Sequence, residues 1–555
     1  MLKRLVWVYA IFIVGMQFIL MQVFSVINNK DYVAVVERQG SYTLTVAKTR
    51  GRIYDAKMRP IAGGYPQTRV AIAPSSIDLA AFKAAVPEDT FEGMKEFLNK
   101  SYPFAFTLPM EKLEAEGVTV FNTETRYGAS FPAVHTVGYL DSTGQNGLTG
   151  IEKAYNDVLS NASGSLKITY QVDARGGVLA GFAPEINDTT ALSKAGVVLT
   201  IDKDIQAIAE EAAGAYLGTG SVVVMEIPSG DIRAMVSVPG FSPLSLESVL
   251  DNEDSPLINR SMSAFDLGSV FKLVTAAAAL ECGIPSDTRF TCNGSLQIGT
   301  NVFTCNGGAA HGELDMEGAV THSCNLYFIQ LAQQIGGERL LKTAKVMGFG
   351  KSLVLAPNYE SSAGKLPSES TLIQPAALAN FSFGQGELLA TPLHDAALVG
   401  TIASKGIYIT PRLVDRIVDA EGKTVEVMRS PAAHMAINES TARELAQFMN
   451  TTVLEGTAKP GKPEECSSAA KTGTAETGMK KDGKKVLQAW YAGFFPYEKP
   501  KYVCVVLAEN GKSGGRSGGP VFKQIADEIT LFEAAQKQAE EAVEPVTPTD
   551  AYIVE

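Results

Sequence analysis

The feature that most constrains this chain is an apolar stretch close to its N-terminus. Leu5 to Ile27 carry no charged side chain, and about 20 such residues in a helix cross the hydrocarbon core of a bilayer. Lys3 and Arg4 precede the stretch, and positive charge tends to stay on the cytoplasmic side. A cleaved signal peptide is the alternative, but its apolar region would be unusually long and no small-residue cleavage site precedes Asn28. We therefore expect residues 1–28 to form a cytoplasmic tip and a single-pass anchor in the cell membrane, followed by an extracytoplasmic chain.

Size and charge limit the remaining possibilities. The chain has 555 residues, too many for one hydrophobic core, so we expect two or more domains. Its 45% hydrophobic and 19% charged residues are typical of a globular protein. The net charge is −12 and no block rich in lysine and arginine stands out, so nucleic acid is not an expected partner.

The cysteines and histidines predict no metal site. The six cysteines include no Cys-x-x-Cys pair, and the five histidines are scattered without a His-Glu-x-x-His motif, so we expect neither zinc nor any other cofactor. The run Phe290-Thr-Cys-Asn-Gly294 recurs as Phe303-Thr-Cys-Asn-Gly307, which predicts the two arms of a small hairpin. An exported domain permits disulfides. We favour the pair Cys292–Cys305, with two free thiols as the open alternative, because sequence alone does not fix the pairing.

Residues 29–195 mix short strands with helical pieces and contain no catalytic cluster. Thr43 to Val46 alternate as a strand does, whereas Phe91 to Asn99 place apolar residues at spacings of three and four, which predicts a helix. This region reads as a spacer or docking module.

Residues 196–533 follow a different pattern. The apolar runs Ser221–Ile227 and Ile232–Val238 flank a Pro/Gly turn and predict a β-hairpin. Helices are expected next and strands return near the end, which favours one antiparallel sheet flanked by helices and closed by sequence-distant strands. Residues 534–555 lack apolar periodicity and predict a disordered acidic tail. The other expected elements are a strand at Val197–Ile201, helices at Ile205–Tyr216 (capped by Asp202), Val270–Cys282 and Leu326–Ile335, and strands at Trp490–Phe495 and Tyr502–Leu507.

Three short elements that carry chemistry occur in order: Ser269-Val-Phe-Lys272, Ser323-Cys-Asn325 and Lys471-Thr-Gly-Thr474. Single matches are weak evidence, since Ser-x-x-Lys also begins at Ser362 and Ser468. Context favours Ser269. It opens a stretch that is apolar almost all round and ends at Gly283, as expected of a buried central helix. The alternative for Ser269 is a helix-capping serine.

The residue types suit acyl transfer. Positions three apart share a helix face, so the Lys272 amine can approach the Ser269 hydroxyl. A serine hydroxyl becomes a good nucleophile when a base takes its proton, and burial gives a lysine the lowered pKa that a base needs. Ser323 could pass a proton to the leaving amine, and the Asn325 amide could hold the substrate backbone. For these two residues, a helix cap before Leu326 is the alternative.

The third element suits substrate binding. Lys471 would add positive charge beside the site. An extended Thr472-Gly473-Thr474 could pair with a peptide edge to edge, and Gly473 would let the backbones come close. Thr474 could bind the substrate carboxylate, and its N–H would form an oxyanion hole with that of Ser269.

With these elements the chain resembles the class B penicillin-binding proteins, the monofunctional transpeptidases of peptidoglycan synthesis. The resemblance spans roughly residues 1 to 533 and includes Arg50-Gly-Arg-Ile53 with Asp55, and Gly384-Gln-Gly386. It implies a multidomain α+β fold, with a mixed α/β pedestal or dimerisation-like domain at 29–195 and a serine β-lactamase-like transpeptidase domain at 196–533. It also implies a D,D-transpeptidase that cross-links stem peptides through a Ser269 acyl-enzyme, which β-lactams would form as well.

Two alternatives stay open. The three motifs do not decide whether water or an amine deacylates the enzyme, so a D,D-carboxypeptidase or a serine β-lactamase would carry them too. A non-catalytic β-lactam receptor or scaffold is the third possibility. Stem peptides and β-lactams are the expected ligands. No separate glycosyltransferase region is apparent, so a glycosyltransferase and division or elongation membrane proteins are expected partners.

Overall fold

The computed structural model of this protein describes residues 2–27, 40–429, 433–481 and 483–543. Contacts divide the chain into two compact units. The first is Met1–Gly51, Gly63–Gly128 and Asn161–Ala195, and the second is Arg52–Ala62, Ala129–Ser160 and Gly196–Glu555. The domain bounds expected from the sequence stay predictions. The contact division differs from them, since residues 52–62 and 129–160 pack with the second unit.

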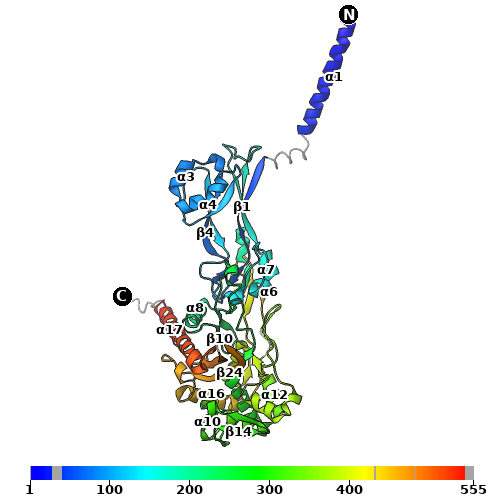
Figure 1. The fold of residues 1–555 in the computed structure, drawn as a ribbon. Coiled ribbons are helices and arrows are strands. Elements are labelled where there is room, and N and C mark those ends of the chain that lie inside the picture. The colour runs from blue at the N-terminus through cyan, green and yellow to red at the C-terminus, as the bar shows by residue number, and fades with distance from the viewer. Residues whose placement is uncertain (1, 28–39, 430–432, 482, 544–555) are drawn as a thin grey trace, which may run out of the picture. The chain divides into compact units, whose positions relative to one another are not determined.

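The predicted anchor lies in α1 (Leu2–Ile27), a single helix with a mean hydropathy of 2.2 in its most apolar window (Figure 1). It is the one helix in the described part of the chain that is long and apolar enough to cross a membrane. This N-terminal helix is consistent with a single-pass membrane anchor.

The first unit contains two small antiparallel sheets. One has the order β1 (Ser41–Thr49), β7 (Gly164–Gln171) and β8 (Glu185–Asp188), and the other has the order β5 (Phe104–Leu108), β4 (Tyr65–Ile72) and β6 (Val118–Thr125). Helices α3 (Leu79–Ala85) and α4 (Glu88–Leu98) pack Phe82, Phe91 and Met94 into one core with the second sheet. The predicted strand at Thr43–Val46 and helix at Phe91–Asn99 are confirmed.

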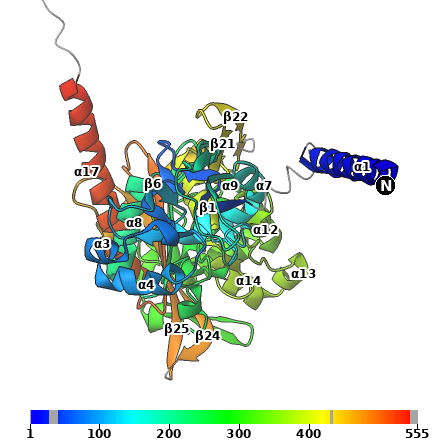
Figure 2. The ribbon, with the colours of Figure 1, turned by 90° about the horizontal axis from the view of Figure 1, so that it is seen from above.

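The second unit is built on a five-stranded antiparallel sheet. Its order is β11 (Ile232–Val238), β10 (Gly220–Glu226), β26 (Tyr502–Glu509), β25 (Lys484–Phe495) and β24 (Ala469–Lys481). The predicted hairpin is β10–β11, and β26, from the far end of the sequence, pairs with β10. In Figure 2, β24 and β25 lie side by side in orange. The predicted closure of the sheet by sequence-distant strands is confirmed.

Helices cover both faces of this sheet, which explains why apolar side chains point to both faces of β10 from Val222 to Met225. Successive strand residues point to opposite faces. Val222 and Val224 enter a core with α8 (Lys203–Tyr216) and α17 (Gly519–Val543), whereas Val223 and Met225 enter the larger core on the other side. The remaining helices of this unit are α5 (Val134–Val137), α6 (Gly150–Ala154), α7 (Asn156–Asn161), α9 (Lys272–Glu281), α10 (Met316–Thr321), α11 (Asn325–Ile335), α12 (Gly337–Val346), α13 (Glu369–Leu372), α14 (Pro375–Ser382), α15 (Pro392–Ala403) and α16 (Glu439–Leu454).

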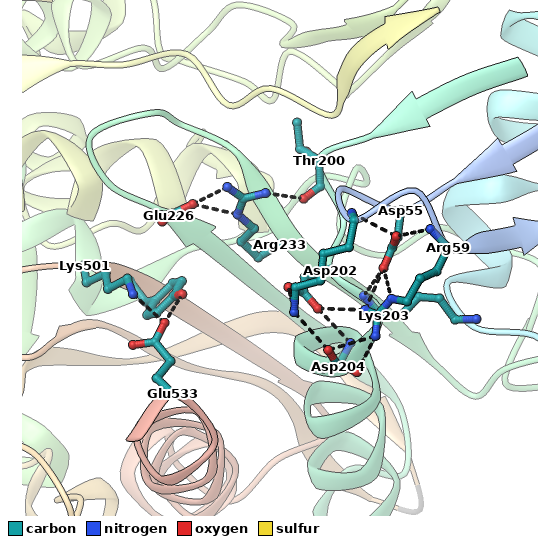
Figure 3. Close-up of polar contacts among 12 residues, drawn as sticks. Asp55, Arg59, Thr200, Asp202, Lys203, Asp204, Glu226, Arg233, Lys501 and Glu533 are labelled. Carbon is teal, nitrogen blue, oxygen red and sulfur yellow. Dashed lines mark hydrogen bonds and ion pairs between the residues drawn. The ribbon is translucent and has the colours of Figure 1, made fainter. Parts of the chain in front are cut away.

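A second sheet joins an early segment to the strand that begins at residue 196. Its order is β22 (Thr424–Val427), β21 (Val414–Val418), β9 (Gly196–Leu199), β2 (Arg52–Tyr54) and β3 (Pro60–Ala62), with β2 parallel to β9. After β2, the buried Asp55 carboxylate accepts hydrogen bonds from the backbone N–H and Nε of Arg59, both at 2.7 Å. The Arg59 guanidinium also reaches Asp204, 2.8 Å away, in the first turn of α8 (Figure 3). Asp202 caps α8 as predicted, accepting from the N–H of Asp204.

Two expectations are corrected. Helix α17 continues to Val543, so residues 534–543 are helical rather than disordered. Their alanine, glutamate, glutamine and lysine residues have a high helix propensity, so this segment forms a helix although it lacks an apolar face. Residues 544–555 lie outside the described residues. The predicted hairpin of the two Phe-Thr-Cys-Asn-Gly runs is also wrong: β14 (Ser295–Ile298) pairs with β15 (Asn301–Thr304), whereas β13 (Phe290–Cys292) pairs with β16 (Gly312–Leu314).

Candidate active site

Ser269 lies in a tight turn that leads into a buried helix. Gly268–Phe271 form a 3-10 turn, and α9 follows from Lys272. The predicted helix therefore exists, but its first turn is 3-10 rather than α. The helix ends as the sequence indicated: Gly283 has φ of +79°, its N–H donates to Leu280 O, and the next N–H donates to Ala279 O, the Schellman arrangement.

Lys272 is fully buried directly behind this turn. Its Nζ donates to three oxygens: the Ser323 carbonyl at 2.7 Å, the Ser323 hydroxyl at 3.2 Å and Asn325 Oδ1 at 2.6 Å. Burial lowers the pKa of Lys272 to about 7, because the interior solvates an ammonium ion poorly. A large share of this amine is therefore neutral near pH 7, as a general base requires.

Ser323 lies in the sharp connection between α10 and α11, and Asn325 is the first residue of α11. Ser323 has φ of +55°, a left-handed conformation that is unusual for a residue with a side chain. The sulfur of Cys324, and neither Ser323 nor Asn325, caps α11 by accepting from the N–H of Tyr327. The helix-cap alternative for Ser323 and Asn325 therefore has no support, and both side chains are available to Lys272.

Lys471 approaches the same hydroxyl from the sheet. Its Nζ lies 2.9 Å from Ser323 Oγ and 2.9 Å from the carbonyl of Thr472. Like Lys272 it is fully buried, and neither lysine has a carboxylate partner within the described part of the chain. Burial, and then the positive charge of Lys272, hold the pKa of Lys471 well below its usual value. One serine hydroxyl therefore bridges two buried amines, a path along which a proton can move.

Strand β24 carries Lys471 to Thr474 at the edge of the five-stranded sheet, paired only with β25. A Cβ on Gly473 would stand 2.9 Å from Leu267 O and 3.1 Å from Val270 Cγ2. Gly473 therefore lets the strand pack against the turn that bears Ser269. The sequence analysis had instead predicted that Gly473 lets the backbone of a peptide substrate come close to this strand. The Thr474 carbonyl group, in turn, lies 3.1 Å from where a Cβ on Gly268 would stand, so the Ser269 turn and Thr474 are neighbours.

A cleft of about 1030 Å³ opens in front of these groups. Six of the eight residues singled out from the sequence line it, and the remaining two, Lys272 and Lys471, are buried and donate to Ser323, one of the six. The six lining residues are Ser269, Ser323, Asn325, Thr472, Gly473 and Thr474.

The structure adds cleft residues that sequence reasoning passed over. Asn301 to Thr304 of the β14–β15 hairpin line it, and so do Ser513 to Arg516. A Cβ on Gly514 would stand 2.1 Å from Trp490 O and 2.7 Å from Gly473 O, so a glycine is needed for this loop to reach β24. The glycine-rich run at 514–519 was the available signal. Arg516 is exposed there and has no carboxylate partner among the described residues.

The cysteines are all free thiols. The favoured Cys292–Cys305 disulfide is therefore wrong, and the alternative of two free thiols holds. Both residues are buried beside Cys324. The sequence did not indicate that these three cysteines lie together, because no short cysteine motif links them.

Residues 220–527 match the penicillin binding protein transpeptidase domain family. The chain is 30% identical to stage V sporulation protein D of Bacillus subtilis over 466 residues, covering 80% of this chain and 68% of that protein. It is 31% identical to the peptidoglycan D,D-transpeptidase PbpA of Mycolicibacterium smegmatis over 327 residues, covering 54% of this chain and 65% of that protein. The chain thus spans about two thirds of the length of these relatives.

The fold is also similar to a solved structure. The D,D-transpeptidase domain of a peptidoglycan glycosyltransferase from Eggerthella lenta matches with a TM-score of 0.64 at 25% identity, covering 88% of this chain and 99% of that chain. The family match includes all three motif elements. The chain therefore belongs to the penicillin-binding protein transpeptidases, in their class B, monofunctional branch.

Proposed function

We propose that this chain is a serine-type peptidoglycan D,D-transpeptidase in which Ser269 forms the acyl-enzyme. The observation that carries the proposal is the Ser323 hydroxyl, which two buried lysine amines share at a cleft that Ser269 also lines. Buried, unpaired lysines are costly in a protein interior, so their convergence on one hydroxyl is a functional arrangement.

The first half-reaction follows from these positions. The neutral Lys272 amine takes the Ser269 proton, and Oγ attacks the carbonyl carbon of the penultimate D-Ala in a stem peptide. The N–H groups of Ser269 and Thr474 stabilise the oxyanion. The peptide C–N bond breaks, and the proton travels through Ser323 to the leaving D-Ala amine. The product is an ester between Ser269 and the shortened peptide.

The second half-reaction reverses the roles. An amine of a neighbouring stem peptide attacks the ester carbonyl and loses a proton to the Lys272–Ser323–Lys471 relay. The ester C–O bond breaks, and Ser269 regains its proton. Asn325, and the free edge of β24 at Thr472 to Thr474, would align the peptide in an extended conformation. β-Lactams would acylate Ser269 by the same first step.

The setting of this reaction is also a proposal. We infer that the N-terminus is cytoplasmic and that the catalytic region lies outside the membrane, with residues 1–28 as anchor and tip, 29–195 as pedestal and 196–533 as transpeptidase domain. The positive charges of Lys3 and Arg4 support this orientation. A glycosyltransferase and membrane proteins of division or elongation are the proposed partners, because a monofunctional enzyme cross-links glycan strands that another enzyme polymerises.

Labelling of the full chain with a fluorescent penicillin tests the nucleophile. We expect a long-lived adduct, one acyl group by intact mass, and peptide mapping to Ser269. Ser269→Ala should abolish labelling. Ser362→Ala, which alters another Ser-x-x-Lys serine in an exposed loop, is the matched control and should label normally. Labelling of Ser269→Ala would remove Ser269 from this role, and rapid release of the label would point to a hydrolase instead.

A further inference from the structure

Four side chains behind the cleft bring metal-binding atoms together. The sulfurs of Cys292, Cys305 and Cys324 and a ring nitrogen of His311 all lie within 4.8 Å of one another. We propose that these four residues bind one zinc ion, and that the ion fixes the Ser323–Asn325 turn to the hairpin that lines the cleft. The expectation of no metal site rested on short spacings. It could not detect ligands that come from four separate positions along the chain.

The distances agree with tetrahedral coordination. Zinc lies about 2.3 Å from thiolate sulfur and about 2.0 Å from imidazole nitrogen, which sets ligand separations near 3.8 Å for two sulfurs and near 3.5 Å for sulfur and nitrogen. The Cys305 and Cys324 sulfurs are 3.7 Å apart, and His311 Nδ1 lies 3.5 Å from each of the Cys292 and Cys305 sulfurs. A disulfide requires about 2.05 Å, and no cysteine pair in the described chain forms one.

The donor set and its surroundings favour zinc over other ions. Three thiolates and one imidazole are the soft ligands of structural zinc sites. All three cysteines are at most 1% exposed, and His311 is partly buried, so most of the site is shielded from water. Three thiolates and Zn²⁺ leave one negative charge. The N-terminus of the eleven-residue helix α11, whose Tyr327 N–H lies 3.5 Å from the Cys324 sulfur, offsets that charge through its dipole.

The position of Cys324 links this site to the cleft. Cys324 stands between Ser323 and Asn325, which both accept hydrogen bonds from Lys272. Cys305 directly follows β15, whose Thr304 carbonyl accepts a hydrogen bond from Asn325 Nδ2 at 3.4 Å. A bound metal would tie both segments at their sulfurs. It would also maintain the left-handed backbone of Ser323, a conformation that persists only when its surroundings over-determine it. The four ligands are thus positioning residues and do not contact the substrate.

Elemental analysis of the full chain, purified in detergent, tests metal binding directly. We expect about one zinc per chain. Cys292→Ser and His311→Ala should lose zinc, whereas Cys282→Ser, which alters an exposed cysteine outside the cluster, is the matched control and should keep it. Exchange of zinc for cobalt should give the thiolate-to-cobalt charge-transfer bands of a tetrahedral site. This cobalt measurement uses the wild-type chain, so it remains decisive even where a cysteine variant fails to fold.

The predicted effect of zinc on acylation rests on the proposed function of Ser269. The prediction that the chain binds zinc does not. Removal of zinc from the wild-type chain with a chelator should slow penicillin acylation about tenfold, as loss of a positioning contact does, and added zinc should restore it. A wild-type chain that acylates normally, contains no zinc and takes up none would overturn the inference and leave the proposed function intact. A disulfide between two cluster cysteines in that chain would overturn it as well. A zinc-loaded chain with no label on Ser269 would instead overturn the proposed function.

Discussion

Gly473→Ala is expected to separate the nucleophile from the strand that faces it. The added Cβ would stand 2.9 Å from Leu267 O, 3.1 Å from Val270 Cγ2 and 3.2 Å from Trp490 Cβ, whereas ordinary contacts begin at 3.4 Å. Leu267 O is backbone, and Asp266 beside it is fixed because its carbonyl accepts a 2.8 Å hydrogen bond from Trp490 Nε1. The strand must therefore retreat by about 0.5 Å, which shifts the N–H of Thr474 relative to that of Ser269.

The size of the effect follows from this displacement. A shift of about 1 Å in a catalytic group costs about 100-fold in rate, so about 0.5 Å predicts a tenfold loss in the second-order rate constant of penicillin acylation. Overpacking of this kind destabilises by about 1–3 kcal/mol, so the melting temperature should fall as well.

Stopped-flow measurement of acylation by a chromogenic β-lactam, together with a melting curve, tests this reasoning. Gly214→Ala is the matched control, because nothing lies within 4 Å of a Cβ on Gly214. That residue is exposed on α8, where alanine favours the helix by about 1 kcal/mol. The control should acylate at the wild-type rate and melt slightly higher. A Gly473→Ala chain with wild-type acylation and melting would refute the claim that this glycine sets the gap between strand and nucleophile.

Three further predictions follow from the structure. Burial lowers the pKa of Lys272 to about 7, and the neutral amine is the proposed base, so acylation should slow about tenfold from pH 8 to pH 6. A rate that rises toward pH 6 would contradict this role. Arg516→Ala should raise KM about tenfold for a peptide with a terminal carboxylate and leave KM for its amide analogue unchanged, and equal effects on both would exclude carboxylate binding. Asp55→Ala leaves the N–H groups of Lys57 and Arg59 without their acceptor, so the free energy of unfolding should fall by about 2 kcal/mol, measured by denaturant titration; an unchanged value would show that water replaces the carboxylate.

Local sequence patterns were sufficient to predict features that depend on a single hairpin or a single helix. The apolar runs at Ser221–Ile227 and Ile232–Val238 form a hairpin because both faces of β10 are buried. The helix after Ser269 ends at Gly283 because only glycine adopts that positive φ without strain. The acidic segment 534–543 was misjudged because helix propensity acts there without the periodicity that an amphipathic pattern shows.

The sequence alone predicted which groups carry the chemistry, since few protein families combine a serine, a lysine three residues later and the two further motifs in this order. Only the tertiary structure decided how they meet. Lys272 and Lys471 share the Ser323 hydroxyl, and the loop at Gly514 closes one side of the cleft. Cys292, Cys305 and Cys324 gather around His311. These contacts join residues far apart in the chain, and their distances follow from the packing of the whole sheet and its helices, which no local pattern encodes.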